Sequence, residues 1–349
     1  MKLLKISLVL LTLVVLTKGH TRESMFRLGY NNCIACHTSP RGGQFLTQYG
    51  QLISNSLSMT KKDLKSKSSN FEQDIKLRLA HVRTDFSNST FPMQADYLTA
   101  FKIGKGQLLT SIARAPQRRS VSDAVEKPNT IETLYLRELK YLFSAFSKKI
   151  TVGREMQNLG LTLEDHTVFT KSENRFNVTD LANVLSLDSL GKKINYSFHL
   201  FTPSFQEKAS NREYGVKGEF DYTLGKYQFG AGALVGLGDS IDRILLNLNS
   251  KIRFTKQFLL QFEATLTQRS LELGNSFAQQ AYLILLSFFP IESVELFSQI
   301  EKLKREEPFE VSNQRYGLGI NLKLYTHLSW RTDWKRTQLS QRDEDLYIS

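Results

Sequence analysis

The sequence predicts an all-β chain: a transmembrane antiparallel β-barrel of about sixteen strands, with fourteen as the alternative, preceded by a small helical module. Three observations predict it. From Phe71 onward apolar residues recur at every second position, and the connections between these segments alternate between long and very short. After the N-terminal leader, no stretch approaches the ~20 consecutive apolar residues that a membrane helix needs. We therefore divide the chain into residues 1–19, 20–70 and 71–349.

The clearest strand covers residues 316–324, where every even position from Tyr316 to Leu324 is apolar and every odd position is glycine or polar. Residues 258–266 and 328–335 alternate in the same way. Alternation over segments of about ten residues is typical of barrel strands that turn apolar side chains toward lipid and polar ones inward. A soluble sandwich also alternates, so the connections have to decide between the two folds.

The connections follow one rule along the chain. Long polar ones lie near residues 87–91, 115–130, 157–179, 203–211, 238–241, 271–275 and 305–311. Short ones lie at residues 104–105, 147–148, 191–193, 225–226, 255–256, 290–291 and 325–326. Bacterial outer-membrane barrels have long external loops and tight periplasmic turns. An even strand number, with residues 343–348 as the last strand, places both barrel ends in the periplasm.

A barrel with this number of strands normally encloses an aqueous lumen. The inward positions of the last long strands carry polar and charged residues, namely Arg315, Asn321, Lys323, Arg331, Asp333 and Lys335. These side chains predict a wet interior. They are equally compatible with a lumen that has no charge selectivity.

The N-terminus has the three-part form of a secretory signal. Residues 1–5 are basic, residues 6–16 are almost entirely apolar, and Thr17 and Gly19 are small residues at the −3 and −1 positions. This pattern predicts export and cleavage after Gly19, and the apolar run is too short to span a membrane. No cysteine follows closely, so we expect no lipid anchor.

The net charge of the chain raises the question of a nucleic-acid partner. The formal net charge is +12, from 46 Lys+Arg and 34 Asp+Glu. The basic residues are interleaved with acidic ones along the whole chain instead of forming a cluster of the nucleic-acid-binding type. We therefore expect no nucleic-acid partner.

Residues 20–70 are predicted to form the helical module and its linker. Apolar residues recur at helical spacing at Phe45, Leu46, Tyr49, Leu52, Ile53 and Leu57. Residues 39–43 end any preceding helix, because they contain proline and two glycines. A segment this small has too little core of its own, so we expect it to pack against the barrel.

The two cysteines of the chain lie in this module as Cys33-Ile34-Ala35-Cys36-His37. Two thiols at this spacing can add to the two vinyl groups of one haem, and the following imidazole is the proximal iron ligand. The sequence therefore predicts one covalent haem c on Cys33, Cys36 and His37. A disulfide or thioredoxin-type pair and a zinc site are the alternatives; the first lacks a surrounding βαβ pattern and the second lacks further ligands.

The sixth iron ligand is open at this stage. Met59 follows the predicted helix, and Met25 and His20 flank the motif. An open coordination position is the other alternative, and Arg41 is then the distal candidate for a small haem enzyme.

The remaining histidines are less suited to be iron ligands. His327 has inward parity at a short turn and could meet the module from below, although an ordinary lumen role fits it better. His81 has outward parity, His166 falls in a predicted external loop and His199 lies inside a strand. We assign all three ordinary structural roles.

Residues 32–51 resemble the leading segment of a group of proteobacterial outer-membrane proteins. In that group a signal peptide and a single c-type haem motif, followed by Ser-Pro-x-Gly-Gly and Tyr-Gly elements, precede a long β-rich region; here these elements are residues 39–43 and 49–50. The resemblance implies a haem-bearing barrel in the lipid of the bacterial outer membrane, with the haem module in the periplasm. More loosely, the plan is similar to porin–cytochrome conduits, which rely on separate multihaem proteins that this chain does not contain.

Two functions follow from these features. The first is electron transfer with periplasmic or lumen-threaded cytochromes, because one haem cannot conduct across a hydrocarbon core of about 30 Å. In this role the protein is an electron carrier rather than an enzyme. The alternative is a porin-like transport channel in which the module is a plug, a gate or a redox sensor.

Overall fold

The computed structural model describes most of the chain beyond the N-terminal leader. The described residues are 23–40, 45–61, 70–84, 88–115, 133–163, 165, 167–174, 176, 181–203, 212–239, 241–271, 276–306, 310–325, 328–338 and 343–348. The predicted signal at 1–19 and the residues His20, Arg41, His166 and His327 lie outside them.

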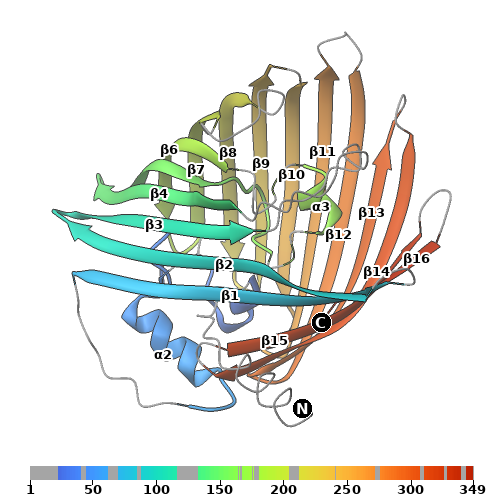
Figure 1. Cartoon of the computed structure of the whole chain (residues 1–349), viewed down its shortest axis with the longest axis horizontal. Helices are drawn as coiled ribbons and strands as arrows, with labels where there is room; N and C mark the ends of the chain where they lie inside the picture. Colours follow the sequence, from blue (N-terminus) through green and yellow to red (C-terminus); the bar gives the residue numbers. More distant parts are fainter. Residues whose placement is uncertain are drawn as a thin grey trace.

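The described part of the chain forms one closed barrel of sixteen strands, in which each strand pairs with its neighbour in sequence (Figure 1). The strands are β1 (Phe71–Thr84), β2 (Asn88–Ile103), β3 (Gly106–Ala115), β4 (Thr133–Ala145), β5 (Lys148–Met156), β6 (Leu181–Leu190), β7 (Ile194–Pro203), β8 (Glu213–Leu224), β9 (Tyr227–Gly238), β10 (Ile241–Arg253), β11 (Phe258–Leu271), β12 (Ser276–Ile291), β13 (Val294–Arg305), β14 (Val311–Tyr325), β15 (Leu328–Gln338) and β16 (Asp343–Ile348). The barrel closes where β16 pairs antiparallel with β1, with Val82 opposite Ile348. The predicted fold class and strand number are confirmed.

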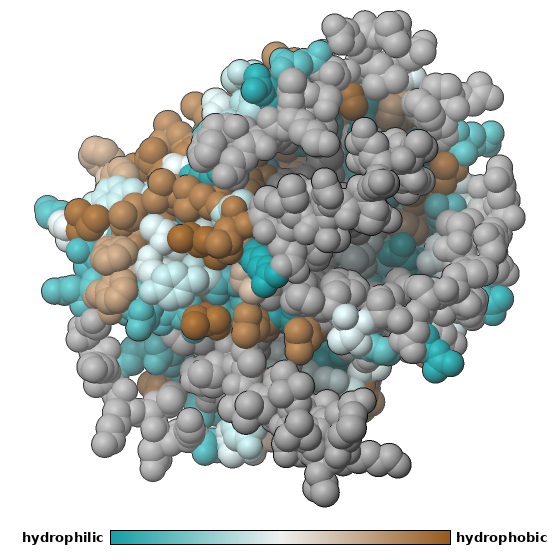
Figure 2. Space-filling view, in the orientation of Figure 1, coloured by the Kyte–Doolittle hydropathy of each residue, from teal (hydrophilic) through white to brown (hydrophobic). Residues whose placement is uncertain are grey.

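The two faces of the wall differ as the alternation predicts. In β10, Ile244, Leu246 and Leu248 are 53%, 50% and 60% exposed, whereas Arg243 and Asn247 are buried on the inner side. Hydrophobic side chains gather on the outer wall at the left of Figure 2. Exposed rows of apolar side chains are stable where the surrounding solvent is lipid.

Tight turns join successive strands at the end of the barrel where the sequence predicts short connections, here named the short-turn end. Gly104 and Gly225 have φ of 58° and 59°, and Phe146 and Ser147 have φ of 50° and 58°. Left-handed conformations of this kind match the twist of two-residue hairpin turns. The short connections predicted at these three positions are confirmed.

One predicted external loop is wrong. In the connection between β5 and β6, predicted outside the barrel over residues 157–179, the described residues 157–163, 165, 167–174 and 176 fold into the lumen, where the short helix α3 (Phe169–Ser172) contacts β11, β12 and β13 (Figure 1). Leu159 and Phe176 are each 1% exposed and pack with Leu234 and Leu245 of the inner wall. Burial of these apolar side chains stabilises the inward position of the loop.

The N-terminal segment, residues 23–61, occupies the short-turn end. It contains the 3₁₀ helix η1 (Glu23–Leu28) and the helix α2 (Gln48–Ser56). Phe26 packs with Leu259 and Phe289 of the wall. On another part of the wall, Phe45 packs in a cluster with Leu98, Ala100, Leu109 and Leu142. The expected packing of this segment against the barrel is therefore observed.

The predicted apolar stripe behaves differently from expectation. Phe45 and Leu46 precede α2 and are buried, but Tyr49 and Leu52 on the helix are 46% and 51% exposed. Instead α2 buries its small residues Gly50 and Ser54. The helix therefore approaches its neighbours closely and leaves part of its apolar surface uncovered.

The inner wall is polar, as predicted, but protein covers part of it where water was expected. Lys335 and Glu263 are each 0% exposed, because the inward loop lies on them. Among the described residues, no helix is long and apolar enough to cross a membrane.

Candidate functional site

Cys33, Cys36 and His37 project from a single tight turn. The backbone nitrogens of Cys36 and His37 donate to the Cys33 carbonyl at 3.2 and 2.9 Å. Cys33 is half-buried, whereas Cys36 and His37 are 5% and 1% exposed, and no disulfide joins the two cysteines. The turn thus holds two thiols and an imidazole within five residues, the donor set that the sequence predicts for a c-type haem.

The start of α2 clamps this turn. The Thr47 backbone nitrogen donates to the Cys36 carbonyl at 2.9 Å, and Thr47 Oγ1 donates to the Ala35 carbonyl at 3.1 Å. Thr47 is also the N-cap of α2, where its side chain accepts from Gly50 N at 3.0 Å. One side chain therefore joins the cysteine turn to the helix, and sequence reasoning did not identify it.

Gly50 lies directly against the turn. A Cβ added at Gly50 would collide with the backbone carbonyl of Cys36. Only glycine allows this close approach of helix to turn. The Tyr-Gly element on which the resemblance partly rests therefore has a packing reason in this chain.

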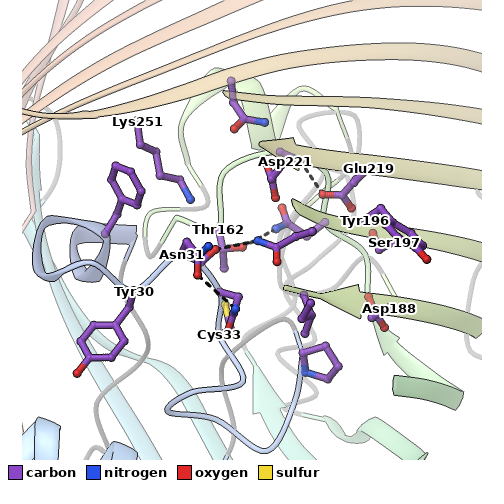
Figure 3. Close-up of a pocket in the computed structure, with 18 of the residues that line it drawn as sticks. Tyr30, Asn31, Cys33, Thr162, Asp188, Tyr196, Ser197, Glu219, Asp221 and Lys251 are labelled. Atoms are coloured by element: carbon purple, nitrogen blue, oxygen red, sulfur yellow. Dashed lines mark hydrogen bonds between the residues drawn. The ribbon is translucent and has the colours of Figure 1, made fainter. Parts of the chain in front are cut away.

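Two asparagines before the turn attach it to the barrel. Asn31 donates to the carbonyls of Gly191 and Lys192 in the β6–β7 turn, and Asn32 donates to the Gly191 carbonyl at 3.4 Å. In return, Asn195 Nδ2 donates to the Asn31 carbonyl at 3.0 Å. Figure 3 shows Asn31 beside Cys33, facing the strands of the wall.

A buried arginine attaches η1. Arg27 is 3% exposed; its Nη2 lies 2.5 Å from Glu292 Oε2 and its Nη1 donates to the Lys256 carbonyl at 3.0 Å. The guanidinium also lies 4.0 Å from the Phe289 ring centroid. Arg27 therefore links η1 to two separate short turns.

The far end of the segment is held by backbone bonds. Met59 N and Thr60 N donate to the carbonyls of Lys323 and Leu324 at 2.9 and 3.0 Å. Among the described residues, the N-terminal segment is thus tied to the rim of the barrel around the turns after β6, β10, β12 and β14.

A cavity of about 120 Å³ lies beside Cys33, between the N-terminal segment and the wall. Met25, Tyr30 and Pro40 line it on one side; Asp188, Glu219, Asp221 and Lys251 lie among its wall residues (Figure 3). Pockets that enclose drug-sized ligands are ~300–1,000 Å³. This cavity is therefore too small to enclose a porphyrin, although the donor set itself fits covalent attachment and iron ligation.

The three candidates for the sixth ligand stand in different places. Met25 lines the cavity together with Cys33. Met59 lies outside that lining and is 45% exposed at the rim. His20 falls outside the described residues.

Two groups of the segment have raised pKa values. Burial raises the pKa of the Cys36 thiol, although Lys323 acts in the opposite direction. Burial and the hydrogen bond with Tyr49 raise the pKa of Tyr30 to about 12. A protonated thiol is a weaker nucleophile than a thiolate, so this environment does not favour thioredoxin-type exchange.

The inward loop forms a second constellation around Glu263, which is 0% exposed. Lys171 Nζ lies 2.9 Å from Glu263 Oε1, and Thr170 Oγ1 donates to Glu263 Oε2 at 2.7 Å. Leu161 N donates to Glu263 Oε1 at 2.9 Å. Gly160, with φ of 76°, allows this approach, because a Cβ there would collide with Glu263.

Further along, the loop is held by Glu301, Arg315 and Lys335. Phe169 N donates to Glu301 Oε2 at 2.7 Å, and Arg315 Nη1 donates to the Thr167 carbonyl at 2.9 Å. Lys335 forms an ion pair with Asp165. Burial by itself would raise the pKa of Asp165, but Lys335 and then Arg331 outweigh it and hold that pKa well below its usual range.

The inward charges of β14 and β15 therefore bind a loop instead of lining open water. Sequence reasoning found Arg315, Arg331 and Lys335 by parity but missed their partners. Acidic residues at inward positions in the middle of strands, such as Glu263 and Glu301, are the signal that such partners exist, since a buried carboxylate requires compensation.

Two other histidines have structural surroundings. His199, fully buried inside the wall, has Nδ1 3.8 Å from Glu155 Oε1 and Nε2 3.9 Å from Asp188 Oδ1. His81 Nδ1 lies 2.8 Å from Thr90 Oγ1 on the neighbouring strand. Neither lines the cavity beside Cys33.

No protein-family model matches this chain, and no curated protein does. Solved structures do. OmpT expressed in the outer membrane of Vibrio cholerae superposes with a TM-score of 0.61 at 10% identity, covering 81% of this chain and 98% of that one. An anion-selective porin from Comamonas acidovorans gives 0.56 at 11% identity, covering 80% and 96%. Salmonella typhi OmpF in complex with daunomycin gives 0.55 at 10% identity, covering 80% and 96%. At these identities the likeness establishes the fold, that of outer-membrane β-barrels.

Proposed function

We propose that this protein is a porin-like channel of the bacterial outer membrane whose passage is controlled by two inserted segments. The inward loop, residues 157–176, narrows the middle of the lumen. The N-terminal segment, residues 23–61, plugs the periplasmic mouth. The observation that carries the proposal is the docking of this segment on the turns after β6, β10 and β14.

The outer-membrane placement is supported by the fold and by the wall. The outer face carries exposed apolar rows, as in β10, and the inner face carries the charges. The strand ends that precede the longest connections, after β3, β5 and β7, are opposite the tight turns, so we place the plugged end in the periplasm.

The two inserts differ in how firmly they are attached. The inward loop is bound through buried charges, including Lys171, Glu263 and Arg315, which are expensive to separate in a low-dielectric interior. The N-terminal segment is bound by the packing of Phe26 and Phe45 on the wall, by an ion pair of Arg27 with the half-exposed Glu292, and by hydrogen bonds to backbone carbonyls at the rim. Each such bond contributes only about 1 kcal/mol net. The N-terminal segment is therefore the movable element and the inward loop the fixed one.

The plug carries the candidate haem attachment. We assign the thioether bonds to Cys33 and Cys36, and the proximal ligand to His37, because one turn presents all three. Haem bound there supplies one-electron redox chemistry. The residues of the chain hold the turn rigid through Thr47 and Gly50, and Met25 is the better placed sixth ligand because it shares a cavity with Cys33. In this arrangement the plug senses the redox state of the periplasm.

Electron transfer with a periplasmic cytochrome is the second candidate. One observation favours it: the cysteine turn lies at the mouth beside the β6–β7 turn, not deep in the lumen. A single haem at that place can exchange electrons only on its own side of the membrane, since the hydrocarbon core is about 30 Å thick.

Planar-bilayer conductance separates these functions. The mature protein is compared with a variant that lacks residues 20–61 and retains the whole barrel. We expect the deletion to raise single-channel conductance several-fold, and reduction with dithionite to change the conductance of the mature protein but not that of the deletion variant. Equal conductance of the two proteins contradicts the plug, and a haem with no effect of reduction on conductance favours electron transfer.

A further inference from the structure

The lysines of five successive short turns gather at the periplasmic rim. They belong to the connections from β2–β3 to β10–β11 and are Lys105, Lys148, Lys192, Lys193, Lys226 and Lys256, defined here as the basic arc. Residues 104–105, 146–148, 191–193, 225–226 and 254–257 contain no aspartate or glutamate. The arc is therefore a continuous positive edge along one end of the barrel.

Five of the six lysines of the arc are available to a partner, whereas Lys148 donates to Ser189 Oγ at 2.6 Å. Apart from Lys148, which is half-buried, they are exposed, and within the described part of the chain none of the six forms an ion pair. By contrast, the β12–β13 turn carries Glu292, which binds Arg27. Uncompensated like charges on a rim raise the local potential and attract molecules of opposite charge.

The arc surrounds the plug instead of standing apart from it. The backbone carbonyls of Lys192 and Lys256 accept hydrogen bonds from Asn31 and Arg27 of the N-terminal segment. The same turns thus bind the plug through their backbone and present their lysines outward. Figure 3 shows Asn31 beside Cys33, and Asn31 donates to the Lys192 carbonyl, so the cysteine turn lies close to the β6–β7 turn that carries Lys192 and Lys193.

An uncovered apolar surface lies within the same end of the barrel. Tyr49 and Leu52 on α2 are 46% and 51% exposed, and Met59 just after it is 45% exposed. An apolar centre with a charged rim is the composition of a protein-binding surface. Lipid headgroups would approach from the outer wall, where Lys148 lies over the exposed ring of Tyr196 at 4.7 Å, and would leave the α2 surface uncovered.

We propose that the basic arc and the exposed face of α2 form the docking surface for an acidic periplasmic protein. Its carboxylates face the arc and its apolar residues cover Tyr49 and Leu52. Electrostatic attraction of this kind speeds association and sets orientation, and salt weakens it. A docked partner contacts the plug directly and can stabilise it in the mouth or withdraw it.

The inference rests on the proposed orientation of the barrel but needs neither haem nor channel activity. The probe is a fluorescein-labelled random copolymer of glutamate and tyrosine, added to the detergent-solubilised full-length protein and followed by fluorescence anisotropy. The test variant replaces Lys105, Lys192, Lys193, Lys226 and Lys256 with glutamine. The matched control is K302Q/K304Q, because Lys302 and Lys304 are exposed on β13, away from the arc.

We expect the parent protein to bind the copolymer at low salt. The affinity should fall at least about tenfold in the arc variant, and by a similar factor in the parent at about 0.5 M salt. The control variant should bind with the affinity of the parent. Leu52→Ser is expected to weaken binding of the glutamate–tyrosine copolymer but not binding of poly-glutamate, which contains no tyrosine. Equal binding by parent and arc variant overturns the proposal. Arc-dependent binding to phosphatidylglycerol vesicles, with no binding of the copolymer, also overturns it and assigns the arc to lipid. The binding result does not depend on the outcome of the conductance test, so the docking surface and the plugged channel can be refuted independently.

Discussion

Lys171 Nζ lies 2.9 Å from Glu263 Oε1 inside the barrel, with side chains 2% and 0% exposed. Ninety-two residues separate the two in sequence. The lysine belongs to the inward loop and the glutamate to the wall strand β11, so this ion pair joins the insert to the barrel. Thr170, Leu161 and Asn247 add hydrogen bonds to the same carboxylate.

Breaking this pair is expected to release the inward loop. Lys171→Met leaves Glu263 buried with fewer positive partners, and loss of one member of a buried pair destabilises by about 3–5 kcal/mol. We expect higher single-channel conductance and faster protease cleavage between β5 and β6. Lys302→Met, on the exposed outer part of β13, is the matched control. A closed, protease-resistant K171M protein would show that the pair does not hold the loop.

Gly50→Ala is expected to separate α2 from the cysteine turn, and so to loosen the plug, while leaving the barrel intact, because the added Cβ meets the Cys36 carbonyl. Conductance should rise, and covalent haem should be reduced. Heat-modifiable migration in electrophoresis, which reports the closed barrel, should not change. Gly218→Ala on β8 is the control, since no atom lies within 4 Å of a Cβ placed there. Normal haem content and conductance in G50A would refute the clamp.

The Asp165–Lys335 pair should resist acid. The pKa of Asp165 is lowered in the folded protein, so its contribution to stability is present above the unfolded value of about 3.9 and is lost only as pH falls through the folded value. We expect conductance to be constant between about pH 7 and pH 4, above the ordinary aspartate pKa. Asp165→Asn should open the loop at all these values. Acid opening of the parent near pH 5, or a D165N protein whose conductance equals that of the parent at pH 7, would contradict this assignment.

Covalent haem should depend on the cysteine turn. Cys33→Ala and Cys36→Ala are each expected to reduce haem staining after denaturing electrophoresis and to abolish it together. Met25→Ala should shift the absorption spectrum toward high spin, whereas Met59→Ala should not, because only Met25 shares a cavity with Cys33. Retained low-spin haem in M25A combined with its loss in M59A would reverse the ligand assignment. A parent protein without haem would eliminate the redox role and leave the plug to be judged by conductance alone.

The strands were predictable from sequence because their signal is local. In the segment 316–324, the even positions face lipid and are apolar, whereas the odd positions face the lumen and are polar or glycine, so the sequence shows a period of two. The turns at Gly104 and Gly225 were also predictable, since a left-handed conformation favours glycine. The cysteine turn was recognised from five consecutive residues. What it touches, at Thr47, Gly50 and Gly191, was not.

The sequence by itself therefore predicted the barrel, with about sixteen strands and fourteen as the alternative, its inward and outward faces, and the residues that we propose bind a haem. Only the tertiary structure decided that the described residues of the β5–β6 connection fold inward, that the N-terminal segment packs on the rim, and that lysines scattered from position 105 to position 256 lie along one end of the barrel. Periodicity records the solvent that each side chain faces. It does not show whether an inward charge such as Lys335 contacts water or another part of the chain, because both environments are polar. That choice depends on partners far away in sequence, and closing the barrel brings them together.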